Sequence, residues 1–121
     1  MAAKALLVPG YDRELSTRQV RERLGVSQER LAHVLSVTSR TVERWEKIDE
    51  LPSTPDRIRR LKTLAAIAEL GEIVFGKEAF RRFLKLPQPV FGARTPWETI
   101  ERGDAEHVYG VLAAEYEGLG F

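Results

Sequence analysis

The stretch SQERLAHVLSVTSRTVERWE, residues 27–46, decides the fold class because it contains two short helical patterns joined by a turn. In the first pattern, Leu31 and Leu35 fall on one face of a helix. In the second, Val42 and Trp45 share a face, and the residues around them are polar. The spacing predicts two consecutive helices that pack through these apolar faces.

The same stretch has the spacing of a helix-turn-helix. Ala32 is a small residue at the position where the two helices would cross, and Ser36 lies at the turn. Val42 and Trp45 would hold the second helix so that its N-terminal residues protrude, as a helix that enters a DNA groove requires.

Helical patterns fill most of the remaining chain. Ser16 or Thr17 caps an early helix, and Thr95 with Glu98 forms a capping box. Residues 86–92 are expected to form an extended loop, because two prolines there forbid a helix. Helices are predicted over residues 16–24, 27–35, 38–48, 56–75, 77–85, 95–103 and 104–118. Because no segment alternates as a strand does, the chain is predicted to be all-α: an N-terminal helix-turn-helix followed by a small C-terminal helical bundle.

The composition excludes several classes of protein. The chain has 121 residues, too few for a large catalytic fold, and it has no cysteine and only two isolated histidines, His33 and His107. No nucleophile motif or Gly-rich phosphate loop is present, so we expect no enzymatic activity, metal, cofactor or small-molecule substrate. No apolar run reaches the roughly 18 residues of a membrane span. We expect a cytoplasmic protein, because the apolar N-terminal patch stops at Pro9 and does not resemble a secretory signal.

Charge is distributed unevenly along the chain. Residues 1–62 hold 13 Lys or Arg against 9 Asp or Glu, whereas residues 63–121 hold 6 against 9. A basic half suits a polyanion such as DNA, and a mildly acidic, aromatic-bearing half suits a protein surface. The alternative is that these charges only solvate two faces of the molecule.

The segment Leu51-Pro-Ser-Thr-Pro55 marks a boundary between modules, because its two prolines stop a helix. The predicted division is an N-terminal arm over 1–15, the helix-turn-helix over 16–50, a linker over 51–55, and a dimerisation and partner-binding domain over 56–121. The helix after the linker is predicted to begin at Asp56, as its cap.

The second half of that helix is apolar nearly all round and therefore needs burial on several sides. The C-terminal helices, a second copy of the chain, or both could cover it. We expect a homodimer. The candidate dimerisation residues are Leu64, Ile67, Leu70 and Val74.

The N-terminal half resembles the Xre (Cro/C1-like) helix-turn-helix family, including the ending Thr41-Val42-x-x-Trp45-Glu46 of its second helix. It departs from the family at Ser36, where a glycine is usual and a non-glycine in a left-handed turn costs about 1 kcal/mol. The resemblance implies binding to operator DNA. Arg40 would contact a guanine edge, and Arg44 or Lys47 would contact phosphate. The expected DNA-binding residues are Gln28, Thr38, Ser39, Arg40, Thr41, Arg44 and Lys47. The alternative is a helical hairpin kept for packing, with its arginines solvated beside Glu43 and Glu46.

The C-terminal half carries a second resemblance. In order along the chain, it has Leu86-Pro87, Phe91-Gly92, Thr95-Pro-Trp-Glu-Thr-Ile100, Gly103, Val108, Leu112 and Glu117-Gly118. This order resembles the toxin-binding domain of Xre/MbcA/ParS-type antitoxins, a family that also places an Xre-like helix-turn-helix before this domain. The resemblance implies a dimeric type II antitoxin that covers the active site of an NAD-depleting RES-domain toxin and represses its own operon.

Aromatic and arginine side chains in loops and near the C-terminus are the candidate toxin contacts, because such residues dominate interface energies. They are Phe91, Arg94, Trp97, Tyr116, Gly118 and Phe121. The alternative is that Phe91, Trp97 and Tyr116 are core residues of a small bundle. Two other functions fit the same chain. One is a stand-alone dimeric transcriptional regulator with no toxin partner; the other is a protein-interaction adaptor that no longer contacts DNA.

Overall fold

The computed structural model describes residues 15–119, and within them the chain is entirely helical, with no strand. The all-α prediction is confirmed. The α-helices are α2 (Thr17–Leu24), α3 (Gln28–Leu35), α4 (Ser39–Lys47), α5 (Pro55–Phe75), α6 (Lys77–Leu84), α7 (Pro96–Glu101) and α8 (Ala105–Gly118). None of the helices in this part of the chain is long and apolar enough to cross a membrane.

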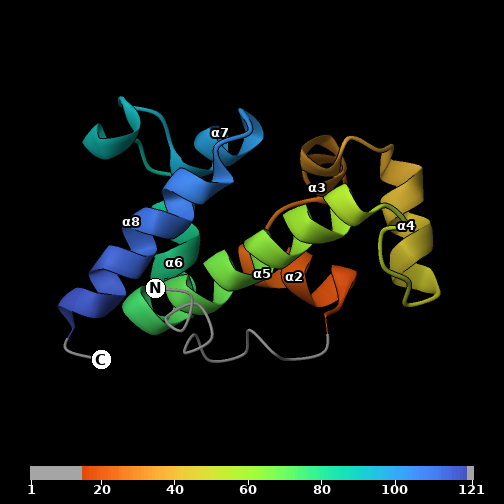
Figure 1. Cartoon of the computed structure of the whole chain (residues 1–121), viewed down its shortest axis with the longest axis horizontal. Coiled ribbons are helices and arrows are strands. Elements are labelled where there is room, and N and C mark those ends of the chain that lie inside the picture. Colours follow the sequence, from red (N-terminus) through yellow and green to blue (C-terminus); the bar gives the residue numbers. More distant parts are fainter. Residues whose placement is uncertain (1–14, 120–121) are drawn as a thin grey trace.

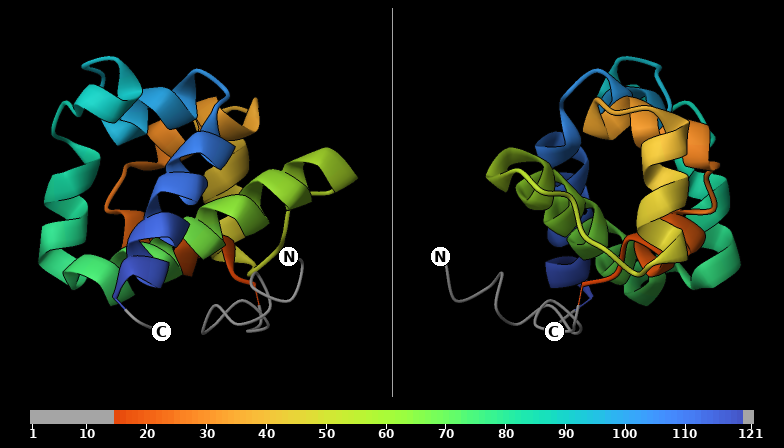
Figure 2. Two further views of the ribbon diagram at one scale, coloured as in Figure 1. Left: turned by 60° about the vertical axis from the view of Figure 1, so that its left-hand side comes forward. Right: turned by 90° about the vertical axis from the view of Figure 1, so that its right-hand side faces the viewer.

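Helix α5 runs through the middle of the molecule (Figure 1). The helix-turn-helix elements α3 and α4 lie near its N-terminal end, and α6 and α8 pack near its C-terminal end. The turned views show α8 crossing one side of α5 while α2 lies on another (Figure 2). One helix therefore connects the two halves of the fold.

Side-chain caps fix where α2, α3, α4, α5 and α7 begin, whereas α6 and α8 begin without a side-chain cap bond. Ser16, rather than Thr17, caps α2, and Thr38, rather than Ser39, caps α4. Helix α5 begins at Pro55, capped by Thr54, so the predicted start at Asp56 is wrong. Pro55 is accommodated because the first turn of a helix uses no N–H from its first residue.

The capping box of α7 forms as predicted. The backbone N–H of Thr95 donates to Glu98 Oε1 at 2.8 Å, and the N–H of Glu98 donates to Thr95 Oγ1 at 2.9 Å. The hydrogen bonds from the Thr95 backbone and side chain lower the pKa of Glu98.

The segment over 86–92 is not fully extended as predicted. It contains a 3₁₀ turn, Pro89–Phe91, and an isolated antiparallel bridge between Gln88 and Arg94. A proline that opens a 3₁₀ turn loses no hydrogen bond, so proline excluded only an α-helix here. The turn places Phe91 inside the core.

The apolar half of α5 is covered by the chain itself. Leu64, Ile67 and Leu70 have no exposed surface, and Val74 is half-buried. Helices α2, α6 and α8 pack around them, with Val108 of α8 in the same core. Three of the four residues predicted to form a dimer interface are thus core residues, with no surface left for a second copy.

The residues that interrupt the apolar stretch of α5 each have a structural role. Arg23 of α2 contacts the carboxylates of Glu69 and Glu72, in both cases at 2.7 Å, and ties α2 to α5. Gly71 lies directly beneath the ring of Phe80, where a Cβ atom would come within 2.1 Å of the ring. This glycine allows α6 to fold back closely against α5.

Candidate functional sites

The helix-turn-helix forms as its spacing predicts. Ser36 ends α3 in the left-handed conformation, with φ 58° and ψ 46°. Ala32, Val42 and Trp45 are buried where α3 and α4 pack together. The turn therefore accepts a serine where glycine is the less strained residue.

Apart from Gln28 of α3, the predicted DNA-binding residues lie on α4 and its cap. Thr38, Ser39, Arg40, Arg44 and Lys47 are exposed, and Thr41 is half-buried. No carboxylate within residues 15–119 forms an ion pair with Arg40, Arg44 or Lys47, so their charges face solvent. Thr38 and Thr41 bond to each other through their hydroxyl groups, 3.0 Å apart, as part of the helix cap.

A buried carboxylate, which the sequence did not single out, holds three helices of this half together. The side chain of Glu46 is only 3% exposed, and it accepts hydrogen bonds from Arg21 Nε at 2.5 Å and Arg21 Nη2 at 2.9 Å. Gln28 Nε2 donates to Glu46 Oε1 at 3.0 Å, and Arg18 donates to the backbone carbonyl of Glu46. Gln28, predicted to anchor DNA, thus also braces the start of α3 against α4.

Burial alone would raise the pKa of Glu46, but the hydrogen bonds from Arg21 and Gln28 and the charges of Arg21 and Arg18 outweigh it. The net result is a lowered pKa. The carboxylate is therefore ionised at neutral pH but neutralised locally. Glu46 is not a solvated acid on the DNA-facing surface, whereas Glu43 remains exposed.

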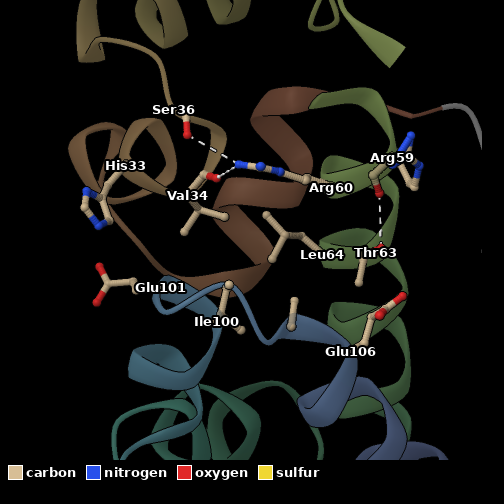
Figure 3. Close-up of a pocket in the computed structure, with 12 residues that line it drawn as sticks. His33, Val34, Ser36, Arg59, Arg60, Thr63, Leu64, Ile100, Glu101 and Glu106 are labelled. Carbon is tan, nitrogen blue, oxygen red and sulfur yellow. Dashed lines mark hydrogen bonds between the residues drawn. The ribbon is translucent and has the colours of Figure 1, made fainter. Parts of the chain in front are cut away.

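Two arginines of α5 connect the long helix to the turn between α3 and α4. Arg57 donates to the carbonyls of Leu35 at 2.8 Å and Ser36 at 3.0 Å. Arg60 donates to the carbonyl of Val34 at 3.0 Å and reaches the Ser36 hydroxyl (Figure 3). These bonds satisfy carbonyls that the last turn of α3 would otherwise leave without partners.

Beside Arg60 is a hollow of about 410 Å³ between α3, α5 and the turn from α7 to α8. Its lining mixes charges of both signs, with Arg59 and Arg60 from α5 and Glu101 and Glu106 from the C-terminal helices (Figure 3). Among residues 15–119, no group of three or more His, Cys, Asp or Glu side chains could hold a metal ion.

The predicted toxin-contact residues do not form one surface. Phe91 and Trp97 are 4% and 3% exposed and belong to the core, and the Trp97 indole N–H has no hydrogen-bond partner among the described residues. Tyr116 is half-buried, whereas Arg94 and Gly118 are exposed. Phe121 lies outside the described residues.

Comparison with known proteins identifies the C-terminal part of the chain. Residues 70–118 match the family model of the antitoxin Xre/MbcA/ParS C-terminal toxin-binding domain. This segment is therefore similar to that domain family.

The fold of the chain is also similar to a solved structure. A chain in the crystal structure of the M. tuberculosis MbcT-MbcA toxin-antitoxin complex is 24% identical, with a TM-score of 0.67. The match covers 84% of this chain and 91% of that chain, so the shared fold extends beyond residues 70–118 to the helices before them. The comparison with curated proteins gives no match.

The segment over residues 70–118 exposes large apolar side chains that periodicity could not identify. Leu86 is 54% exposed, Val90 51% and Phe75 38%. Leu86 and Val90 lie in the irregular segment between α6 and α7, where no helical or strand period assigns a side chain to one face. The one available signal was that these two apolar residues flank Pro87 and Pro89 in a predicted loop.

Proposed function

We propose that this protein is the antitoxin of a type II toxin-antitoxin system, which neutralises a RES-domain, NAD-depleting toxin and represses its own operon. The observation that carries the proposal is the match of residues 70–118 to a toxin-binding antitoxin domain. The helix-turn-helix that precedes this domain supports the second activity.

Neutralisation would be steric. The chain would do no chemistry itself; its C-terminal domain would cover the active site of the toxin and keep NAD out. An exposed protein surface suffices for such a role, whereas catalysis would need convergent titratable groups in a pocket. A second copy of the chain within the complex is part of the proposal, and its contact must lie outside Leu64, Ile67 and Leu70, because these are buried.

Complex formation with the toxin tests the toxin-binding half directly. When the full chain is mixed with the RES-domain protein encoded in the same operon, we expect one complex on size-exclusion chromatography that persists in high salt. An apolar interface resists salt, because screening weakens only its electrostatic part. Two separate peaks under all salt conditions, together with binding to operator DNA, would instead identify a stand-alone regulator.

For the DNA-binding half, Arg40→Ala is expected to weaken binding to the promoter DNA of the operon by about 1–3 kcal/mol and to relax sequence preference. Lys47→Ala should weaken operator and random DNA alike and flatten the salt dependence, because a phosphate contact carries no sequence information. Fluorescence anisotropy on both DNA types measures this, with Arg102→Ala in the exposed part of the toxin-binding domain as control. Equal effects of both variants on both DNAs would contradict the assigned roles.

A further inference from the structure

An apolar groove of about 550 Å³ lies in the C-terminal half, between the end of α5, α6, the segment before α7, and α8. Phe75 and Phe83 form its aromatic wall, with ring centroids 4.8 Å apart. Leu86 and Val90 line another side, and Val111 of α8 also contributes to the lining. The exposed large apolar residues of the toxin-binding domain up to Gly118 therefore converge on one groove.

Single exposed apolar residues need no explanation, but a cluster around a groove is typical of a protein-binding surface. Half of the surface of Leu86 and Val90 is in contact with water. Their burial by a partner would be favourable by the same hydrophobic effect that drives folding.

We propose that the toxin docks in this groove. The proposal rests on the proposed function and states where on the chain the toxin binds. Every residue that lines the groove falls within 70–118, the segment that matches the toxin-binding domain. Two of the four aromatic residues expected to anchor the toxin, Phe91 and Trp97, are buried and cannot do so. The groove offers the apolar contact surface that those two residues do not.

The charges beside the groove specify the chemistry of the toxin segment that fits it. The exposed charges that line the groove are Arg82 of α6 and Glu115 of α8. A matching segment has apolar side chains that fill the space between Phe75 and Val90, bordered by a carboxylate that faces Arg82 and a cation that faces Glu115. Such pairing of an apolar centre with a charged rim is typical of specific protein interfaces.

The test uses the full chain, the RES-domain protein of the same operon, and isothermal titration calorimetry. Leu86→Asp is expected to weaken toxin binding by about 30-fold or more, the range of a central interface residue. The matched control is Ile48→Asp, in the helix-turn-helix half, because Ile48 is 56% exposed against 54% for Leu86. The toxin affinity of the Ile48→Asp variant should stay unchanged. Arg82→Glu, on an exposed side chain that lines the groove, should weaken binding by about 10-fold.

Each variant is also studied without toxin, by thermal melting for its stability and by sedimentation for its oligomeric state, and these measurements distinguish the outcomes. Loss of toxin affinity by Leu86→Asp and Arg82→Glu, with unchanged thermal melting and oligomeric state, supports the proposal. Wild-type affinity for both variants overturns it and leaves the proposed function standing. Dissociation of a dimer by Leu86→Asp places a second copy in the groove and also overturns it. If the wild-type chain does not bind the toxin, the proposed function fails first.

Discussion

Replacing Gly71 with alanine is expected to lower the free energy of unfolding by about 2–3 kcal/mol, because the added methyl group overpacks the core. Its Cβ would lie 2.1 Å from Phe80 Cδ1 and 2.2 Å from Phe80 Cε1. Phe80 has no exposed surface, so its ring cannot swing into solvent, and α6 must move away from α5. The loss is expected despite the gain of about 1 kcal/mol that alanine brings to a helix interior.

Urea unfolding monitored by circular dichroism measures this effect. Gly110 provides the matched control, because it also lies inside a helix but has no atom within 4 Å of an added Cβ. Gly110→Ala should therefore stabilise the fold by about 0.5–1 kcal/mol. Opposite signs for the two substitutions are the expected result. A Gly71→Ala variant as stable as the wild type would contradict the close packing of α6 on α5.

Replacing Arg21 with methionine is expected to destabilise the fold by about 3 kcal/mol, because it leaves the carboxylate of Glu46 buried without its ionic partner. Arg21 supplies two of the hydrogen bonds to that carboxylate, and only Gln28 would remain as a side-chain donor. The effect should depend on pH. The folded-state pKa of Glu46 is lowered, so the pair stabilises the fold above the unfolded pKa of about 4.3, and this is lost as pH falls through the folded pKa.

The free energy of unfolding, measured from neutral to acidic pH, checks both the size of this destabilisation and its dependence on pH. The difference between wild type and Arg21→Met should be largest near neutral pH and shrink in acid. Arg30→Met, on an exposed arginine that pairs with no carboxylate within residues 15–119, should change little at any pH. The double variant Arg21→Met with Glu46→Leu should recover part of the loss, since no buried charge remains. A difference that is constant with pH would exclude Glu46 as the cause.

Much of the fold could be predicted from local patterns. Helix starts depend on cap residues that are adjacent in sequence, such as Ser27 before α3 and Thr95 before α7, so they could be read directly. The turn at Ser36 followed from the distance between two apolar faces. The cap of α5 was misplaced by two residues because Thr54 and Asp56 are both good caps, and only the structure shows which one accepts the hydrogen bond.

The sites were harder to predict, because they depend on which surfaces meet in three dimensions. Periodicity showed that α5 needs cover on several sides, but it does not distinguish cover by α8 from cover by a second copy. Glu46 occupies the polar side of a helical pattern, yet its side chain is buried in an ion pair with Arg21, which lies 25 residues earlier in the chain. Phe91 and Trp97 were the obvious aromatic anchors, and the fold uses them as core. The exposed Leu86 and Val90 lie where no period exists.

The central claim is that this chain neutralises a RES-domain toxin, and the NAD content of intact cells tests it most directly. The toxin of the same operon is expressed in cells with and without this full chain as the proposed antitoxin, and total NAD is measured through the first doublings. We expect NAD to fall sharply with the toxin alone and to stay at the level of uninduced cells when the antitoxin is present. An equal fall of NAD in both cultures, with the antitoxin folded and abundant, would contradict the account.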